Sequence, residues 1–315
     1  MNSQRIELPL AIEGSTLSYF LSMCRHRSLL HMERSWVPEA QAEDRRCPAP
    51  IFVVGCPRSG TTLVGSCLAA HDALAGGHES LFLLELSRIF YGLHQGINRR
   101  SFTPLAKFVP ADTALLAITE FADRIYAGLS SSKDRCRPCV DHTPWYVGLI
   151  PFIDLIYGDA KFVHIVRDGR SVADSLAHSY ARGFPWAGKS VQERAKLWTL
   201  LVGLGIEFGR KVGSHRYLEV RYEQLCLQPR ETIRSIVMWL GYEWDEQVLF
   251  PLAVPAAEPS RNDITLAYEN AADGFVVTPR KQDSSWPKDW TRANREDFRR
   301  IAAAPMAQFG YSMKD

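Results

Sequence analysis

The stretch that decides the fold of this chain is Ile51-Phe-Val-Val-Gly-Cys-Pro-Arg-Ser-Gly-Thr-Thr62. Its first four residues are all apolar, which is typical of a strand buried on both faces of a parallel sheet. A loop of glycine, proline and serine follows, and the pattern then predicts a helix from Thr61 to His71. Loop amides and a helix N-terminus can together hold an anion, so this stretch predicts a phosphate-like or sulfate-like site.

The same order of strand, loop and helix recurs along the chain. Repeated units of this kind predict a parallel sheet covered by helices, here an α/β fold of the P-loop type. In such sheets ligands bind at the carboxyl ends of the strands, so the loops that follow the strands should meet at one site. The further predicted strands are Cys139–Asp141, Lys161–Val166 and Arg216–Val220, and the further predicted helices are 171–180 and 231–240, with Gly241 as the stop of the last.

Length and composition indicate an ordinary globular protein. The 315 residues are 46% hydrophobic and 23% charged, and we expect residues 1–48 to form a helical preamble and linker and residues 49–315 to form a single domain. A net charge of +2 gives no strong field to attract nucleic acid. No apolar run approaches the roughly 18 residues of a membrane-spanning helix, so we expect no membrane span.

The cysteines indicate the compartment. Seven cysteines without a disulfide-like spacing predict reduced thiols and a cytoplasmic protein. Cys136 and Cys139 form one close pair, but no second pair follows at zinc spacing, so we expect no metal site.

The loop from Gly55 to Thr62 differs from a nucleotide-triphosphate loop at one position. Two glycines are separated by four residues as in a Walker A loop, but Thr61 stands where that loop has lysine. Arg58 supplies a cation from inside the loop instead, which favours a single sulfate-like or phosphate-like group. A plain glycine turn and a P-loop kinase or nucleotide hydrolase remain the alternatives at this point.

Pro57-Arg-Ser-Gly-Thr-Thr62 resembles the 5'-phosphosulfate loop of sulfotransferases that use 3'-phosphoadenosine-5'-phosphosulfate (PAPS). The resemblance implies that this loop binds the transferring group. The residues that match the family pattern are Arg58, Ser59, Gly60, Thr61 and Thr62.

Other segments resemble the same family, and especially its tyrosylprotein sulfotransferases and their bacterial relatives. Arg167, at a predicted strand end, and Ser175, on the next helix, match the arginine and serine that hold the 3'-phosphate there. Tyr222 matches a tyrosine near the adenine. Pro279-Arg-Lys281 resembles a segment that closes over the nucleotide, which implies a role for Arg280 and Lys281, although Gln282 replaces the family's glycine.

The base of the reaction is predicted within Gly76-Gly-His-Glu-Ser80. Glu79 matches the catalytic glutamate of the tyrosylprotein enzymes, and we predict that it accepts the proton of the acceptor. His142 stands where many relatives have a lysine, and we assign it to stabilising the transferring group or the leaving oxygen. His78 and His142 are alternative bases. The resemblance departs at Gly77 and His78, because the secretory enzymes have a cysteine just before the glutamate.

The sequence therefore predicts transfer of a sulfuryl group from PAPS to an acceptor hydroxyl or amine, with release of 3'-phosphoadenosine-5'-phosphate. The acceptor is expected to be a small molecule, a carbohydrate, a lipid or a peptide, and no nucleic-acid partner is expected. A kinase, or a nucleotide-binding protein without sulfotransfer, is the alternative. Turnover of ATP with Mg²⁺ would distinguish the kinase.

Overall fold

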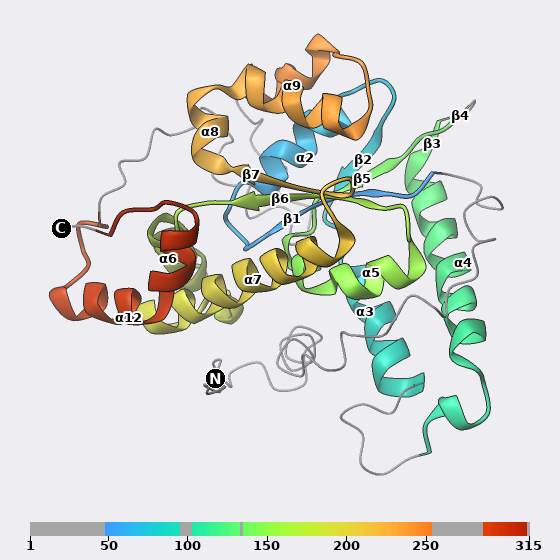
Figure 1. The fold of residues 1–315 in the computed structure, drawn as a ribbon, viewed down its shortest axis with the longest axis horizontal. Coiled ribbons are helices and arrows are strands. Elements are labelled where there is room, and N and C mark those ends of the chain that lie inside the picture. The colour runs from blue at the N-terminus through green and yellow to red at the C-terminus, as the bar shows by residue number, and fades with distance from the viewer. Residues whose placement is uncertain (1–47, 95–102, 133–134, 254–285, 314–315) are drawn as a thin grey trace.

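The computed structural model describes residues 48–94, 103–132, 135–253 and 286–313. Five parallel strands form one sheet in the order β2-β5-β1-β6-β7 (Figure 1). A small antiparallel hairpin, β3 with β4, lies outside that sheet. The strands are β1 Ile51–Gly55, β2 Ala75–His78, β3 Ser131–Ser132, β4 Arg135–Cys136, β5 Cys139–Asp141, β6 Lys161–Val166 and β7 Tyr217–Arg221.

Helices of several lengths connect these strands. The α-helices are α2 Thr61–Ala69, α3 Phe82–Arg88, α4 Ala111–Ser130, α5 Ile150–Ile156, α6 Gly169–Ala181, α7 Val191–Val212, α8 Tyr222–Leu227, α9 Pro229–Leu240, α10 Phe250–Ala253 and α12 Arg292–Gln308. The shorter helical segments are η4 Ile89–His94, η5 Leu105–Lys107, η6 Pro144–Leu149, η7 Pro185–Ala187 and η8 Glu246–Leu249.

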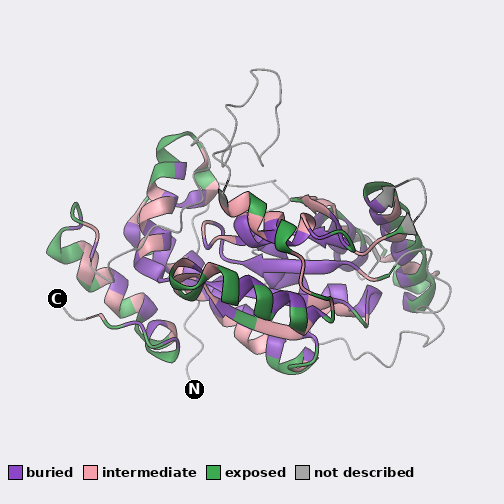
Figure 2. Ribbon diagram, turned by 90° about the horizontal axis from the view of Figure 1, so that it is seen from above, coloured by how far each residue is buried: buried purple, intermediate pink, exposed green. Residues whose placement is uncertain are grey.

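The helices cover both faces of the sheet, with α2, α8 and α9 on one side and α5, α6 and α7 on the other (Figure 1). The central strand β1 shows why both faces are buried. Phe52 and Val54 point into one hydrophobic core, and Ile51 and Val53 point into the other. Successive side chains of a strand alternate between faces, so a strand of apolar residues needs a helix layer on each. Figure 2 shows that strands of the sheet are buried. The predicted α/β fold in a single domain is confirmed.

Several helix ends follow from local sequence. Asp168 caps α6, because its carboxylate accepts a hydrogen bond from the amide of Arg170. Ser190 and Glu193 form a capping box at the start of α7. Gly241 ends α9 in the left-handed region, at φ 92°, as the sequence predicts.

The carboxyl ends of the strands face one side of the molecule. Lys161 marks the amino end of β6, where it donates to the carbonyl of Leu240 at 2.8 Å. In Figure 1, β6 and β7 run from right to left and lead into α6 and α8 at the left of the view. The loops that follow these strands therefore lie on that side of the molecule.

The sequence did not predict β2, α4 or α7. Gly76 and Gly77 make β2 a weak strand by composition, and the register between β2 and β5 shifts between Gly76 and His78. This short strand forms the edge of the sheet next to β5. Its position matters because Glu79 follows it directly.

The expectation of reduced thiols does not hold throughout. Cys56, Cys67, Cys139 and Cys226 are free, but Cys136 is disulfide-bonded. Spacing along the sequence did not reveal this bond, because disulfide pairing depends on distances in the folded chain.

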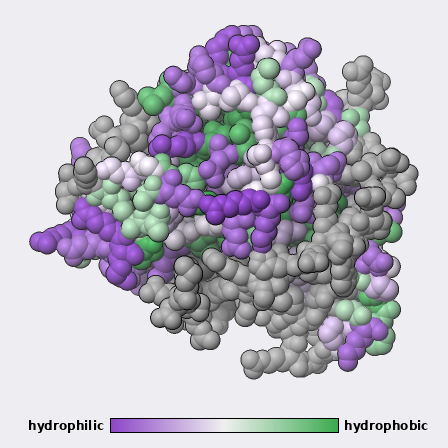
Figure 3. Space-filling model, in the orientation of Figure 1, coloured by the Kyte–Doolittle hydropathy of each residue, from purple (hydrophilic) through white to green (hydrophobic). Residues whose placement is uncertain are grey.

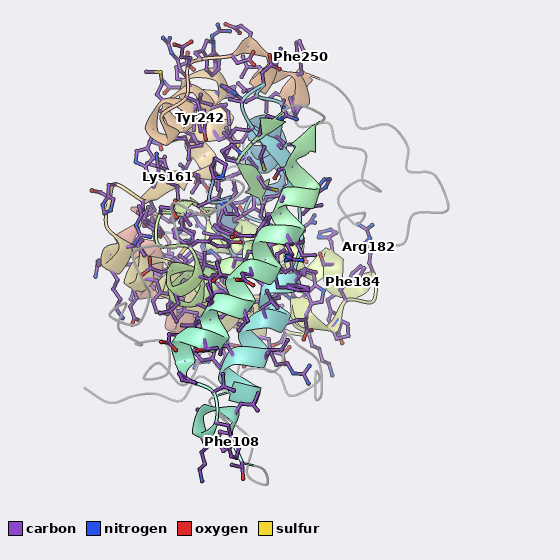
Figure 4. All side chains as sticks on the ribbon, turned by 90° about the vertical axis from the view of Figure 1, so that its right-hand side faces the viewer. Phe108, Lys161, Arg182, Phe184, Tyr242 and Phe250 are labelled. Carbon is purple, nitrogen blue, oxygen red and sulfur yellow. The ribbon has the colours of Figure 1, made fainter. Side chains whose placement is uncertain are left out.

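The surface of the described residues is mixed in character. Figure 3 shows polar side chains along the upper and left edges of that view, and apolar patches near the middle that are interrupted by polar side chains. Phe108 and Phe250 are strongly exposed, but Figure 4 places them at opposite ends of the molecule.

Among the described residues, no helix is long and apolar enough to cross a membrane. The predicted preamble, residues 1–48, lies almost wholly outside the described residues and stays a prediction.

Candidate active site

The loop after β1 is shaped for close approach of its backbone to a ligand. Arg58 and Gly60 both have positive φ angles, 73° and 98°, and the amide of Ser59 donates to the carbonyl of Cys56 at 3.1 Å. Such a backbone costs a non-glycine residue about 1–3 kcal/mol and is found chiefly at functional sites. Ser59 and Thr61 are buried, and within the described residues the Ser59 hydroxyl has no hydrogen-bond partner. This hydroxyl is available to an anion at the N-terminus of α2.

The segment after β6 presents Arg167 and Ser175. Asp168 forms a buried ion pair with Arg170, at 2.6 Å, and the indole of Trp198 donates to the carbonyl of Arg167 at 3.1 Å. These contacts fix the backbone from which the Arg167 side chain extends.

The two segments meet. Nε of Arg58 donates to the hydroxyl of Ser175 at 3.0 Å, and a guanidinium nitrogen of Arg167 donates to the carbonyl of Arg58 at 3.0 Å. The guanidinium of Arg167 also lies over the ring of Tyr222, 4.5 Å from its centre. That ring packs so closely on Gly60 that a Cβ there would lie 2.5 Å from it. Residues from the ends of β1, β6 and β7 thus form one cationic site.

A second centre lies at the start of α2. The hydroxyl of Thr62 donates to Oε1 of Glu79 at 3.4 Å, and Nδ1 of His142 lies 3.6 Å from the same oxygen. The Glu79 side chain is 15% exposed and that of His142 is 3% exposed, so the carboxylate is reachable and the ring is enclosed. Because Thr62 belongs to the predicted phosphate loop, Gly55 to Thr62, Glu79 stands beside the site where that loop would hold an anion.

His142 is oriented by its surroundings. Its Nε2 donates to the carbonyl of Gly77 at 3.0 Å, because a carbonyl can only accept, and its Nδ1 therefore faces Glu79. Gly65 gives the ring room against α2, since a Cβ there would overlap it. Burial alone lowers the pKa of His142, but Glu79, then Asp141 and the Gly77 carbonyl, outweigh it, and the net pKa is raised. A raised pKa favours the imidazolium, which pairs with the Glu79 carboxylate.

The other predicted site residues lie elsewhere. The side chain of His78 is exposed, and its carbonyl accepts a hydrogen bond from the amide of His142 at 3.0 Å. Arg280 and Lys281 fall outside the described residues and stay predictions.

Comparison with known families settles the relationship of the chain. Residues 50–246, more than half of its length, match the model of the sulfotransferase family. The chain belongs to this family. The matched region begins just before β1 and therefore includes the phosphate loop, Glu79, Arg167, Ser175 and Tyr222.

Several curated relatives of this sulfotransferase-family chain are similar over most of it. Protein-tyrosine sulfotransferase A of Caenorhabditis elegans is 26% identical over 74% of this chain and 59% of its own length. Protein-tyrosine sulfotransferase of Drosophila melanogaster is 26% identical over 67% of this chain and 43% of its own length. The nodulation protein NoeE of Sinorhizobium fredii is 26% identical over 62% of this chain and 51% of its own length. The chain thus spans only about half the length of these relatives.

Two solved structures share the fold of this family member. The sulfotransferase domain of a Synechococcus olefin synthase gives a TM-score of 0.53 at 22% identity, covering 87% of this chain and 99% of that domain. The sulfotransferase domain of the curacin biosynthetic pathway gives a TM-score of 0.56 at 18% identity, covering 85% of this chain and 100% of that domain.

The sequence of this sulfotransferase-family chain did not predict the hydrogen-bond network that lies next to Glu79. A buried network of hydrogen bonds connects Ser80, Tyr126, Asp141 and Tyr146. The sequence predicts Asp141 only as the last residue of the strand Cys139–Asp141. Its one sequence signal is a charged residue at the end of an apolar strand, which is typical of a site residue in parallel sheets.

Proposed function

We propose that this chain transfers a sulfuryl group from PAPS to an acceptor hydroxyl or amine and releases 3'-phosphoadenosine-5'-phosphate. The observation that carries this proposal is the meeting of Arg58, Ser175, Arg167 and Tyr222 at the strand ends. Two guanidinium groups, a hydroxyl and an aromatic ring suit a ligand with two separate anionic groups and a base. PAPS has that composition, and the family membership of the chain supports the same donor.

The residues present fit the donor. In the proposal the loop residues Arg58 to Thr62 hold the 5'-phosphosulfate. The buried hydroxyl of Ser59 supports this, because it has no partner among the described residues and such groups are rarely left unpaired. Arg167 and Ser175 hold the 3'-phosphate, and Tyr222 lies near the adenine. Arg280 and Lys281 are proposed to complete the site from outside the described residues.

The protein's own residues would lower the barrier in two ways. Arg58 and the loop amides stabilise charge that develops on the transferring group and on the leaving phosphate oxygen. Glu79 removes the acceptor proton, since its carboxylate is partly exposed and adjoins Thr62 of the loop. His142 stabilises charge at the same centre and lies within 3.6 Å of Glu79. Positioning and electrostatics carry most of the rate in such group transfers.

The acceptor is proposed at the level of its reacting group, a hydroxyl or an amine. The named relatives are protein-tyrosine sulfotransferases and a nodulation protein, and this chain spans about half their length, so their acceptors are not carried over to it. An acceptor screen with labelled PAPS, covering phenols, sugars, hydroxylated lipids and tyrosine peptides, identifies the class. The predicted cytoplasmic location stays a prediction.

Nucleotide calorimetry tests the proposed donor site. Wild type should bind 3'-phosphoadenosine-5'-phosphate far more tightly than AMP, because the cationic site loses its partner when the 3'-phosphate is missing. A contact of this kind is worth about 2–5 kcal/mol, or roughly 30-fold to several-thousand-fold in Kd. Arg167→Ala should remove most of this preference and leave AMP affinity nearly unchanged. Equal wild-type affinities for the two nucleotides would overturn the PAPS assignment and favour a kinase.

A further inference from the structure

The backbone on both sides of Glu79 is tied to the residues that follow β5. On one side, the carbonyl of His78 accepts a hydrogen bond from the amide of His142 at 3.0 Å. On the other side, the amide of Ser80 donates to the hydroxyl of Thr143 at 3.0 Å. The position of Glu79 is therefore set by the turn after β5 as well as by its own strand.

Asp141 lies at the centre of this connection. This residue is 1% exposed. Its carboxylate accepts hydrogen bonds from the hydroxyls of Ser80, Tyr126 and Thr143 and from the amide of Thr143. The Tyr126 bond is 2.8 Å, and the two Thr143 bonds are 2.6 Å and 3.0 Å. All four partners donate, which matches an ionised carboxylate, since only that form accepts on every side.

The Ser80 hydroxyl is held a second time. It lies 2.9 Å from the hydroxyl of Tyr146, and that hydroxyl accepts a hydrogen bond from the amide of Leu83 at 3.1 Å. The network therefore reaches from the turn after β5 into the first turn of α3. Ser80 is the point at which the network meets the neighbour of Glu79.

The segment that carries Glu79 has a strained backbone. Gly76 and Gly77 have φ angles of 94° and 82°, and Leu81, which is not a glycine, has φ 55°. A left-handed conformation at such a residue costs about 1–3 kcal/mol and persists only when surrounding contacts impose it. The contacts of Ser80 with Asp141, Tyr146 and Thr143 supply that constraint immediately before Leu81.

Stability alone does not explain a carboxylate in this place. No arginine or lysine among the described residues forms an ion pair with Asp141. Removing an ionised group from water is costly, and the hydrogen bonds of Asp141, together with the nearby His142 ring whose pKa Asp141 helps to raise, offset that cost only in part. Apolar residues commonly replace such groups without loss of stability, so the cost indicates a role in function.

We propose that Asp141 is a positioning residue of the transfer reaction, which fixes through Ser80 and Thr143 the backbone from which Glu79 reaches the acceptor. This inference rests on the proposed function. Asp141 touches neither the loop residues nor Tyr222 in the contacts described above, so its effect is expected on the chemical step and not on nucleotide binding.

The test compares Asp141→Asn, Ser80→Ala and the double variant, using PAPS and whichever acceptor of the screen wild type turns over fastest. Asn has nearly the same shape but cannot accept four hydrogen bonds. Displacing a catalytic group by about 1 Å costs on the order of 100-fold in rate. We expect kcat to fall about 10- to 100-fold in each single variant, with an unchanged Kd for 3'-phosphoadenosine-5'-phosphate. The double variant should be no slower than Asp141→Asn, because both changes break one connection.

Two controls separate positioning from stability. Tyr126→Phe removes one hydrogen bond to Asp141 but keeps the contact with Ser80, so kcat should stay near that of wild type. Asp154→Asn breaks the ion pair with Arg216, 2.7 Å long, at the amino ends of the strands, and should lower the free energy of unfolding without changing kcat. If Asp141→Asn does not fold, the kcat of Ser80→Ala alone tests the positioning role.

The outcomes distinguish the two proposals. Wild type without turnover on any acceptor overturns the proposed function and the positioning role together. Active wild type with an unchanged kcat in Ser80→Ala and Asp141→Asn overturns the positioning role alone. Strictly additive losses in the double variant, or losses matched by Asp154→Asn at equal stability, also overturn it.

Discussion

Nε of Arg58 donates a hydrogen bond to the hydroxyl of Ser175 at 3.0 Å, although 117 residues separate them. Arg58 comes from the loop after β1 and Ser175 from the helix after β6, and these two strands are neighbours in the sheet. A serine hydroxyl that accepts from Arg58 can still donate its own hydrogen to a phosphate oxygen. The loop proposed for the 5' end of the donor and the helix proposed for its 3'-phosphate therefore form one connected site.

Replacing Arg58 should affect the reaction far more than the fold. We expect Arg58→Ala to lower kcat about 100-fold, because losing one donor that stabilises transition-state charge costs ~3 kcal/mol. Steady-state kinetics with PAPS measures this loss, and thermal unfolding checks the fold. Ser175→Ala is the matched control, because it removes the same hydrogen bond but keeps the cation, and it should weaken nucleotide binding more than kcat. A wild-type rate in Arg58→Ala would remove this residue from the mechanism.

Glu79→Gln should keep nucleotide binding and lose transfer. The amide has nearly the same shape but cannot take the acceptor proton, and a general base contributes roughly 10²–10⁴-fold to the rate. Calorimetry with 3'-phosphoadenosine-5'-phosphate measures nucleotide binding, and kinetics with PAPS measures the rate of transfer. His78→Ala is the control from the same segment, and since that side chain is exposed we expect it to be near wild type. An active Glu79→Gln beside an inactive His142→Ala would move the base to the histidine.

Gly60→Ala should damage the loop for two reasons. Its φ is 98°, and a Cβ would lie 2.5 Å from the Tyr222 ring. We expect the free energy of unfolding to fall by about 1–3 kcal/mol, the usual cost of such strain, with weaker binding of 3'-phosphoadenosine-5'-phosphate. Gly203→Ala in α7 is the control, because nothing lies within 4 Å of its Cβ position, and alanine there should add about 0.5–1 kcal/mol of stability. Equal effects of the two substitutions would contradict the prediction.

His164 should make the fold sensitive to acid. Burial lowers its pKa from 6.5 to about 3, and its Nδ1 contacts the hydroxyl of Tyr217 at 2.5 Å. Above pH 6.5 the histidine is neutral in both the folded and the unfolded chain. As the pH falls below 6.5 only the unfolded chain takes up the proton, so the free energy of unfolding drops by up to about 1.4 kcal/mol per pH unit.

Urea unfolding between pH 8 and pH 5 measures this slope in wild type and in His164→Gln, whose amide can keep a hydrogen bond to Tyr217. The variant should lose less stability than wild type as the pH falls. Parallel curves for the two proteins would show that His164 does not set the acid sensitivity.

The sequence by itself determined the α/β class and the places where ligand-binding loops begin. The strand Ile51–Val54 and the loop from Gly55 to Thr62 could be read directly, because an anion-binding backbone needs particular residues at fixed, short spacing. The strand Lys161–Val166 was predicted with the bounds that the structure has. The edge strand β2 could not be predicted, since its glycines carry no strand signal and it is held by pairing with β5.

Only the tertiary structure decided which side chains meet. That Arg58 contacts Ser175, that Tyr222 packs on Gly60, and that Asp141 joins Tyr126 to Ser80 are contacts between segments far apart in the chain. A hydrogen bond between distant side chains leaves no periodic pattern in the sequence, because its geometry is set by sheet order and helix packing. Local chemistry thus fixed the loops, and the parallel order of the strands brought them together.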